Sequence, residues 1–397
     1  MELGWWKGSR GGNPLVGAAV AVVVTLLACR PNPVRVGLIL PLSGSMASYG
    51  MSLERGARLA EKHVNATGGI DGRRLKLVAA DSGAFPAGPA GAASALERLV
   101  ASDQIVAAVG GASPEECEGL APVAARSGVV LISPSAPLRS REGQGDQLLH
   151  NWPSIASEGE ALADFAAYTL HASKALVFAA AGAGAQEFAE AFAARFRSPG
   201  RDCEVLSAEG ESSGSPPAGL VAALGRCQVA VFAGLGAGTT GAIAVVKALP
   251  KGPVLLARGA IASSTTLKSA EADGVLFARP AFDEGRDSGV LEFAALYAAD
   301  YGEEGDVFAA HAYDAVIMLA ETIARTGSEA DALRNGLLRI RDFPGAAGAV
   351  SFDAAGRAIQ PFHICIVEGG RAVSVQSVAG QALTSLQARV EARRFGK

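Results

Sequence analysis

The sequence predicts an α/β protein made of two doubly wound parallel-sheet lobes joined by a multi-strand hinge. Short runs rich in Val, Ile and Leu alternate with amphipathic stretches from residue 34 onward, and this alternation starts again near residue 175. Strand and helix in steady alternation are typical of a parallel sheet covered by helices on both faces. The chain has 397 residues, which is enough for two domains of ordinary length.

The first series predicts strands at 34–40, 74–81, 105–111 and 129–133, with helices at 48–67, 87–102 and 114–127. In the first of these helices, apolar residues recur at helical spacing and form one inward stripe, namely Leu53, Ala57, Ala60 and Val64. The series ends near Asn151-Trp152-Pro153, where a proline prevents a helix from continuing. We therefore place the joint between the lobes there.

The second series predicts strands at 175–181, 204–209, 229–235, 254–257 and 274–277, with helices at 185–197, 217–225 and 240–249. Helices at 289–301, 307–326 and 329–340 follow, and then strands at 349–352 and 362–367 around a turn at 353–356, where Asp353 and Gly356 suit a tight turn. These late segments are too few for a third domain, so we expect them to complete the first two.

That arrangement requires several crossings between lobes, which make a hinge and a cleft. The expected organisation is a signal peptide at 1–28, a first lobe at 34–153 plus 281–345, a second lobe at 154–280 plus 346–378, and a helical tail at 379–397.

The amino-terminal segment predicts export. Lys7 and Arg10 precede a nearly uncharged run at 14–27, which ends in Leu26-Leu27-Ala28-Cys29. This ending resembles the lipobox of bacterial lipoproteins, which implies that Cys29 is acylated and that the protein lies in the periplasm or at the outer face of the cell membrane. A simple membrane anchor is the alternative, although the run is shorter than the ~20 residues that span a bilayer. A further alternative is that Cys29 is an incidental thiol without a lipid.

Composition excludes a nucleic-acid footprint, because the net charge is −4 and no basic patch is evident. The hydrophobic share of 49% provides for a large core. The other cysteines fit neither a zinc pattern nor CxxC, so buried free thiols are expected rather than a Cys203–Cys227 disulfide, and no metal site or cofactor is predicted.

Two motifs look catalytic. Residues 236–241 fit GxGxxG, but Arg258 ends the next strand where a dinucleotide site needs an acidic residue. Residues 210–214 fit GxSxG around Ser212, but prolines follow where the helix must begin. His311 precedes Tyr313 and Asp314 on a helix facing the expected cleft, where we expect a satisfied, partly buried histidine rather than a ligand contact. No acid, base and nucleophile assemble, so we predict a binder and not an enzyme.

Several stretches together resemble the leucine/isoleucine/valine-binding proteins of bacterial ABC importers, which have the type I periplasmic binding fold. They are 36–44 (VGLILPLSG), 49–50 (YG), 65–73 (NATGGIDGR), 109–111 (VGG), 131–134 (LISP), 312–315 (AYDA) and 348–353 (GAVSFD). The resemblance implies an ABC permease as partner and a small-molecule ligand, such as an amino acid or a related polar or carboxylate solute, held between the lobes.

The resemblance also implies site residues and shows departures. The implied contacts are Tyr49, Ser113 and Ser135 from the first lobe and Gly184, Leu235 and Arg258 from the second. Pro114 and Pro137 stand at or near positions where relatives have donors, Gly184 replaces a tyrosine, and Arg258 lies near the place of an acidic residue. We therefore expect an anionic or strongly polar ligand. A lipoprotein that uses the fold for protein–protein regulation is one rival, and an exported enzyme using Ser212 or a nucleotide is the other.

Overall fold

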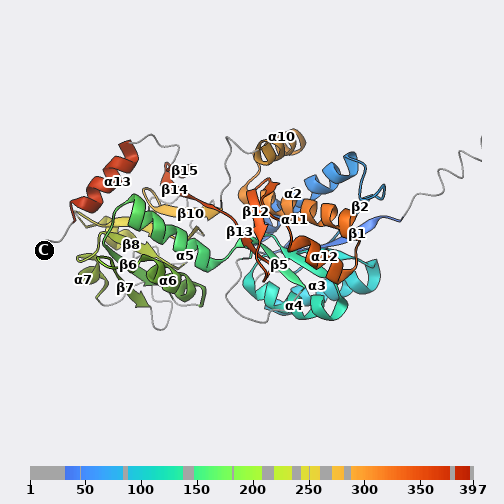
Figure 1. The fold of residues 1–397 in the computed structure, drawn as a ribbon, viewed down its shortest axis with the longest axis horizontal. Coiled ribbons are helices and arrows are strands. Elements are labelled where there is room, and N and C mark those ends of the chain that lie inside the picture. Colours follow the sequence, from blue (N-terminus) through green and yellow to red (C-terminus); the bar gives the residue numbers. More distant parts are fainter. Residues whose placement is uncertain are drawn as a thin grey trace, which may run out of the picture.

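A computed structural model describes the protein as two α/β lobes side by side along its long axis (Figure 1). The described residues are 32–44, 46–83, 88–136, 147–180, 183–207, 219–234, 243–249, 251–259, 271–280, 288–375 and 381–393. The predicted two-lobe α/β class is confirmed, with one refinement: each sheet is mostly parallel but carries antiparallel strands at one edge.

The first sheet has the strand order β11-β12-β13-β5-β4-β3-β1-β2. Its strands run parallel from β13 to β2, whereas β11, β12 and β13 pair antiparallel. Their bounds are β1 Val34–Leu40, β2 Leu75–Asp81, β3 Ala107–Gly110, β4 Val130–Ser133, β5 Leu148–Pro153, β11 Phe343–Gly345, β12 Gly348–Phe352 and β13 Arg357–Ile359.

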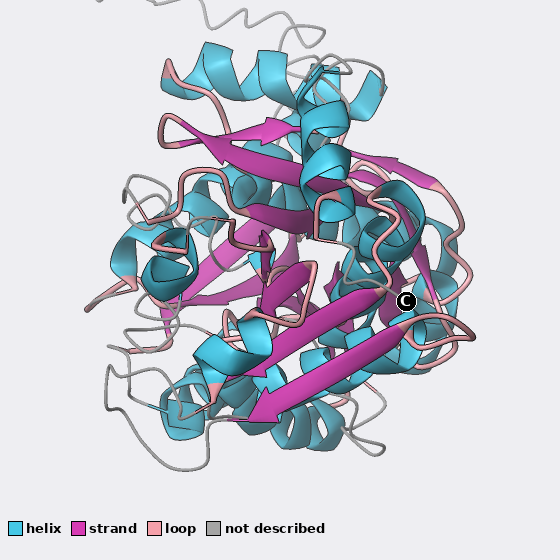
Figure 2. Ribbon diagram, turned by 90° about the vertical axis from the view of Figure 1, so that its left-hand side faces the viewer, coloured by secondary structure: helices cyan, strands magenta, loops and turns pink. Residues whose placement is uncertain are grey.

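Helices cover both faces of this sheet. Figure 2, in which the second lobe faces the viewer, shows strands lying between helices in that lobe as well. Successive β1 residues point to opposite faces, so Leu38 and Leu40 join one core cluster while Ile39 joins another. The first cluster includes α2 (Ala47–Ala66), α10 (Ser288–Tyr301), α11 (Val307–Thr326) and α12 (Ala330–Leu337), and the second includes α3 (Gly88–Asp103) and α4 (Pro114–Ser127). This confirms the predicted double winding of the lobe.

Helix α11 is the central helix of the first lobe. It packs along α2, and among the described helices it alone is long and apolar enough to cross a membrane. Most of it is buried inside the lobe, as in the core helix of a globular domain. Gly56 of α2 lies so close to α11 that an added Cβ would overlap the carbonyl group of Ala309. The two helices can approach this closely because position 56 has no side chain.

The second sheet has the strand order β15-β14-β10-β9-β8-β6-β7. β14 pairs antiparallel with both β10 and β15, and the other pairs are parallel. The bounds are β6 Lys174–Ala179, β7 Asp202–Ser207, β8 Val229–Phe232, β9 Val254–Ala257, β10 Leu276–Pro280, β14 Phe362–Glu368 and β15 Arg371–Ser374.

Two core clusters also lie on opposite faces of this sheet. α5 (Ile155–Asp164), the π-helical turn 165–169 and α6 (Ala183–Phe196) cover one face, and α7 (Leu220–Leu224) with residues 243–249 covers the other. The expected C-terminal helix is present as α13 (Gln381–Glu391), which packs on the second lobe through buried Leu386 and Val390. The side-chain amide of Gln387 donates to the carbonyl of Thr169 at 2.8 Å, which fixes the helix to the lobe.

The chain crosses between the sheets three times: after β5, after β10 and after β13. β5 runs parallel to β4, β13 runs parallel to β5, and β10 runs parallel to β9, so each crossing leaves from the carboxyl edge of a sheet. The predicted joint at Pro153 coincides with the first crossing. The connections therefore lie at the edges where open α/β sheets bind ligands.

One expected boundary is wrong. Residues 346–378 were assigned to the second lobe, but β12 and β13 belong to the first sheet, so the last crossing follows Ile359. The turn at 353–356 has the expected chemistry, since Asp353 accepts hydrogen bonds from the backbone of Ala355 and Arg357 and Gly356 has φ +78°. It joins β12 to the three-residue β13, which is too short to show an alternating pattern.

The expectation of free thiols is confirmed for the described cysteines. Cys117, Cys203, Cys227 and Cys365 are all buried and unpaired with one another. Burial raises the pKa of each thiol, so they remain protonated and behave as small apolar side chains.

Candidate functional site

The first lobe presents three partly buried aromatic rings at the carboxyl edge of its sheet, which we call the aromatic surface: Tyr49, Trp152 and Phe308. The rings of Tyr49 and Phe308 meet edge to face at 4.8 Å between centroids, and Trp152 stacks on Phe308 at 5.3 Å. Tyr49 stands in the first turn of α2, Trp152 near the end of β5, and Phe308 in the first turn of α11. Three separate elements therefore hold the rings in fixed relative positions.

His311 lies behind this surface and is fully buried. Its ring is 4.7 Å from the ring of Trp152. Within the described part of the chain, neither ring nitrogen has a hydrogen-bond partner, so the expectation of a satisfied, partly buried histidine is wrong. Desolvation lowers the pKa of His311 to about 3, and the imidazole is therefore neutral. The side-chain amide of Asn151 donates to the backbone carbonyl of His311 at 2.9 Å and ties β5 to α11.

Ser135 follows β4 and is almost fully buried next to Tyr49. Burial raises the pKa of Tyr49, and the neighbouring Ser135 hydroxyl opposes that effect. The two hydroxyls do not reach good hydrogen-bond geometry, so Ser135 Oγ has no partner among the residues described. The structure thus brings together two of the predicted contacts, Tyr49 and Ser135.

Ser113 is the N-cap of α4 and accepts a hydrogen bond from the backbone of Glu116 at 3.2 Å. The carboxylate of Glu116 in turn accepts from the backbone of Ala112 at 2.7 Å and from the hydroxyl of Ser82 at 2.7 Å. Pro114 occupies the first helical position, where its missing N–H costs little. The predicted contact Ser113 therefore has a capping role, and the protein's own carboxylate lies at this helix start.

The second lobe carries a nearly buried ion pair at the carboxyl edge of its sheet. Arg258 follows β9, and its Nε lies 3.6 Å from the carboxylate of Glu158 on α5. The side chains of Glu158 and Arg258 are only 11% and 13% exposed. Glu158 also accepts a hydrogen bond from the backbone of Gly259. Burial raises the pKa of Glu158, while the charge of Arg258 and the Gly259 bond oppose that effect.

Gly184 lies beside this pair. A Cβ added at Gly184 would lie 3.1 Å from Cδ1 of Ile155 and 3.7 Å from an Nη of Arg258. The guanidinium therefore borders the space that a larger side chain at position 184 would fill. It also lies over the ring of Phe188, at 5.9 Å from the ring centroid, in a cation–π contact. The structure thus places Gly184 and Arg258, two of the predicted ligand contacts, next to each other.

Three residues important to this site are missing from the sequence prediction. The sequence analysis uses Trp152 only to place the joint between the lobes. Phe308 lies in a helix whose many apolar residues predict a core helix and indicate no ligand contact. Glu158 meets an arginine a hundred positions later, and no local pattern indicates that pair. The prediction of a reversed charge at Arg258 is therefore incomplete, because Glu158 supplies a carboxylate from another element.

Other sequence predictions fall outside the described residues. These are the acylated Cys29, the contact Leu235, the residue Pro137, the GxGxxG stretch at 236–241 and the GxSxG stretch around Ser212. Over the described ranges, no group of three or more His, Cys, Asp or Glu side chains is arranged to hold a metal ion.

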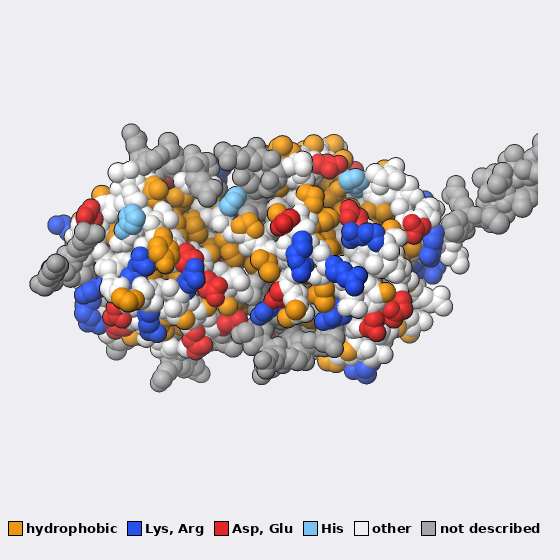
Figure 3. All heavy atoms as spheres, viewed as in Figure 1, with side chains coloured by type: hydrophobic (Ala, Val, Ile, Leu, Met, Phe, Trp, Pro, Cys, Tyr) orange, Lys and Arg blue, Asp and Glu red, His pale blue; other side chains and the backbone are white. Residues whose placement is uncertain are grey.

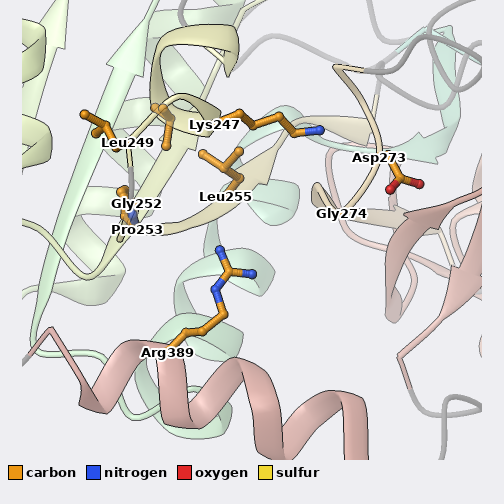
Figure 4. A pocket seen from close by; sticks show the side chains of 9 residues that line it. Lys247, Leu249, Gly252, Pro253, Leu255, Asp273, Gly274 and Arg389 are labelled. Atoms are coloured by element: carbon orange, nitrogen blue, oxygen red, sulfur yellow. The ribbon is translucent and has the colours of Figure 1, made fainter.

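A cavity of about 180 Å³ lies elsewhere, near the amino end of β9 and next to α13. Lys247, Asp273 and Arg389 are among its lining residues (Figure 4). It is at the opposite end of β9 from Arg258 and is not part of the candidate site. On the molecular face shown in Figure 3, basic and acidic side chains are interspersed, and that face has no single-sign patch.

The sequence matches the model of a protein family, the periplasmic binding proteins, over residues 33–371. An amino acid binding protein of Pseudomonas aeruginosa is 32% identical over 122 residues, which are 31% of this chain and 32% of that protein. The matches to the first curated relatives thus span about a third to a half of their length.

Solved structures match over more of the chain. The branched-chain amino acid transporter substrate binding protein of Streptococcus pneumoniae, in complex with isoleucine, has a TM-score of 0.69 and 24% identity, covering 86% of this chain and 100% of that one. A solute binding protein of Rhodopseudomonas palustris, in complex with 3,4-dihydroxybenzoic acid, has a TM-score of 0.71 and 18% identity, covering 87% of this chain and 96% of that one. At these identities the likeness shows the fold.

Proposed function

Because the chain belongs to the periplasmic binding protein family, we propose that it is an extracytoplasmic solute-binding lipoprotein of an ABC importer. It binds a small polar or carboxylate solute between its two lobes and does not convert it chemically. Acylation of Cys29 anchors it to the membrane, and an ABC permease recognises its ligand-bound shape. The anchor and the permease rest on the sequence pattern and on the family.

One observation carries this proposal: all three crossings between the sheets lie at the carboxyl edges that also hold the aromatic surface and the Glu158–Arg258 pair. Connections placed there allow the lobes to move about a hinge while the binding groups stay fixed on rigid elements. A solute that contacts both lobes favours the closed state because only that state makes both sets of contacts.

The same observation weighs against a purely regulatory protein. Such a protein needs no polar groups at the sheet edges, whereas the described edges carry a buried hydroxyl without a partner on Ser135 and a buried Nε without a hydrogen-bond partner on Arg258. Buried polar atoms without partners are costly, and a bound solute can satisfy them.

A thermal-shift screen of amino acids and small carboxylates tests the proposal. We expect at least one stabilising solute, because a ligand at 100 times its Kd adds about 2.7 kcal/mol to the free energy of unfolding. Trp152→Ala removes part of the aromatic surface and is expected to abolish the shift. Tyr168→Ala is the matched control, since Tyr168 is exposed on the second lobe and stacks with Arg201 instead. A screen without any stabiliser would count against solute binding.

A further inference from the structure

The start of α4 in the first lobe is poorly suited to an anionic group. The carboxylate of Glu116 already accepts from Ala112 and Ser82, and the side chain of Ser113 accepts from the backbone of Glu116. A second carboxylate here would meet the like charge of Glu116. An acidic solute must therefore place its charge elsewhere.

The second lobe offers a cation for that charge. Nε of Arg258 is buried, has no hydrogen-bond partner in the described part of the chain, and is held near Glu158 at 3.6 Å, beyond hydrogen-bond distance. Because Gly184 has no side chain, residue 184 does not fill the space beside one Nη of the Arg258 guanidinium. A planar guanidinium recognises a carboxylate with two parallel N–H donors, so the geometry of Arg258 suits that group.

The first lobe offers aromatic rings at the corresponding place, and the carboxylates that act electrostatically on Tyr49 are those of Asp306 and Glu116. Tyr49, Trp152 and Phe308 form the aromatic surface, and the neutral His311 lies behind it. Aromatic rings favour offset or edge-to-face contact with another ring, which contributes more than apolar area alone. The surface therefore suits a planar ring.

A short stretch of the chain links the two groups of residues. Trp152 belongs to the aromatic surface, and Ile155 lies against the Gly184 position beside Arg258. Only three peptide units separate these residues, so their Cα atoms are at most about 11 Å apart. The solute proposed below would bridge this distance.

We propose that the solute is a planar aromatic carboxylate, bound with its ring on the aromatic surface of the first lobe and its carboxylate at Arg258 of the second. This inference rests on the proposed solute-binding function and names its substrate class. Glu158 positions Arg258 and competes with the solute for the guanidinium, which makes it a determinant of affinity.

Isothermal titration of the full chain with four probes tests the inference: benzoate, benzamide, cyclohexanecarboxylate and leucine. Benzamide keeps the ring without the charge, and cyclohexanecarboxylate keeps the charge without the planar ring. We expect benzoate to bind about tenfold or more tightly than each of the others, as for a charge-assisted hydrogen bond or a lost ring contact.

Two variants separate the contributions of Arg258 and Glu158 to benzoate binding. Arg258→Gln is expected to remove the preference for benzoate over benzamide, and Glu158→Gln is expected to tighten benzoate binding several-fold because it removes the competing charge. Arg226→Gln is the matched control: it removes an arginine of the same lobe whose ion pair with Glu204 is exposed. Wild-type selectivity among the four probes remains decisive if the Arg258 variant does not fold.

Three results would overturn the inference. Tighter binding of leucine than of benzoate would leave the solute-binding function standing and reject the aromatic class. Unchanged benzoate affinity in a folded Arg258→Gln variant would reject the placement of the carboxylate. The absence of binding by all four probes and by a wider panel of amino acids and carboxylates would reject the proposed function together with the inference.

Discussion

Replacing Gly56 with Val is expected to destabilise the first lobe by about 4 kcal/mol, more than the roughly 1–3 kcal/mol typical of overpacking, because the clash is with the backbone. An added Cβ at position 56 overlaps the backbone carbonyl of Ala309, and neither α2 nor α11 can move a carbonyl aside as it can a side chain. The helices must separate along their whole contact, which opens the core cluster that contains Leu53, Ala57 and Val316.

Chemical denaturation monitored by circular dichroism measures this loss. Met51→Val is the control, because it places the same β-branched residue on the same helix at an exposed position. We expect the Met51 variant to lose less than about 1 kcal/mol, as for ordinary surface substitutions. Equal midpoints for the two variants would show that α2 and α11 do not pack as described.

Acid is expected to destabilise the protein through two buried histidines. Desolvation lowers the pKa of His150 to about 4 and that of His311 to about 3, from an ordinary value of 6.5. Well above pH 6.5 both imidazoles are neutral in the folded and unfolded chains. As the pH falls below 6.5, these histidines bind protons in the unfolded chain but not in the folded chain, so the free energy of unfolding decreases. The decrease is roughly 3 kcal/mol for each histidine by about pH 4.

The buried Asp314 has the opposite effect on how stability depends on pH. Burial raises its pKa to about 7, against two hydrogen bonds that its carboxylate accepts from the backbone of Ala346 at 2.6 Å and Ala347 at 2.8 Å. A raised pKa means that the folded chain holds a proton that the unfolded chain has lost between about pH 4 and 7, so this group favours folding as the pH falls. The two histidines together outweigh it, and a net loss is expected.

His311→Phe isolates the effect of the buried imidazole. The variant cannot protonate at position 311, so its free energy of unfolding should fall less steeply between pH 6.5 and 4 than that of the wild type. His171→Asn is the control, since His171 is exposed and has φ +58°, which asparagine tolerates. A slope that is the same in all three proteins would contradict a neutral buried His311.

Most of the fold could be predicted from the sequence because its strands and helices have clear periods. The stripe of Leu53, Ala57, Ala60 and Val64 faces the core of the first lobe as expected, and all four are buried. Strand β13 was not predicted because a strand of three residues shows no alternation of polar and apolar side chains. The last boundary between the lobes was therefore placed before β12 and not after β13. Strand β5 was missed because its polar and aromatic residues, among them His150, Asn151 and Trp152, do not form an apolar run.

The candidate site was less predictable because its contacts join distant segments. The structure places Tyr49 beside Ser135 and Gly184 beside Arg258, and all four are ligand contacts that the resemblance implied. The partner of Arg258 could not be inferred, since Glu158 lies in α5 among small and apolar residues at ordinary helical spacing. The capping role of Ser113 agrees with the pattern Ser113-x-x-Glu116, which has the sequence form of a capping box, although Glu116 accepts from the backbone of Ala112; the resemblance assigned Ser113 to ligand binding instead.

Small-angle X-ray scattering tests the central claim, that two lobes close on a solute. The radius of gyration is measured for the chain alone and with a saturating concentration of a solute that raises its melting temperature. A bound solute that contacts both lobes favours the closed form, so we expect the radius of gyration to decrease. An unchanged radius at saturation, with binding verified by calorimetry, would contradict closure of the lobes on the solute.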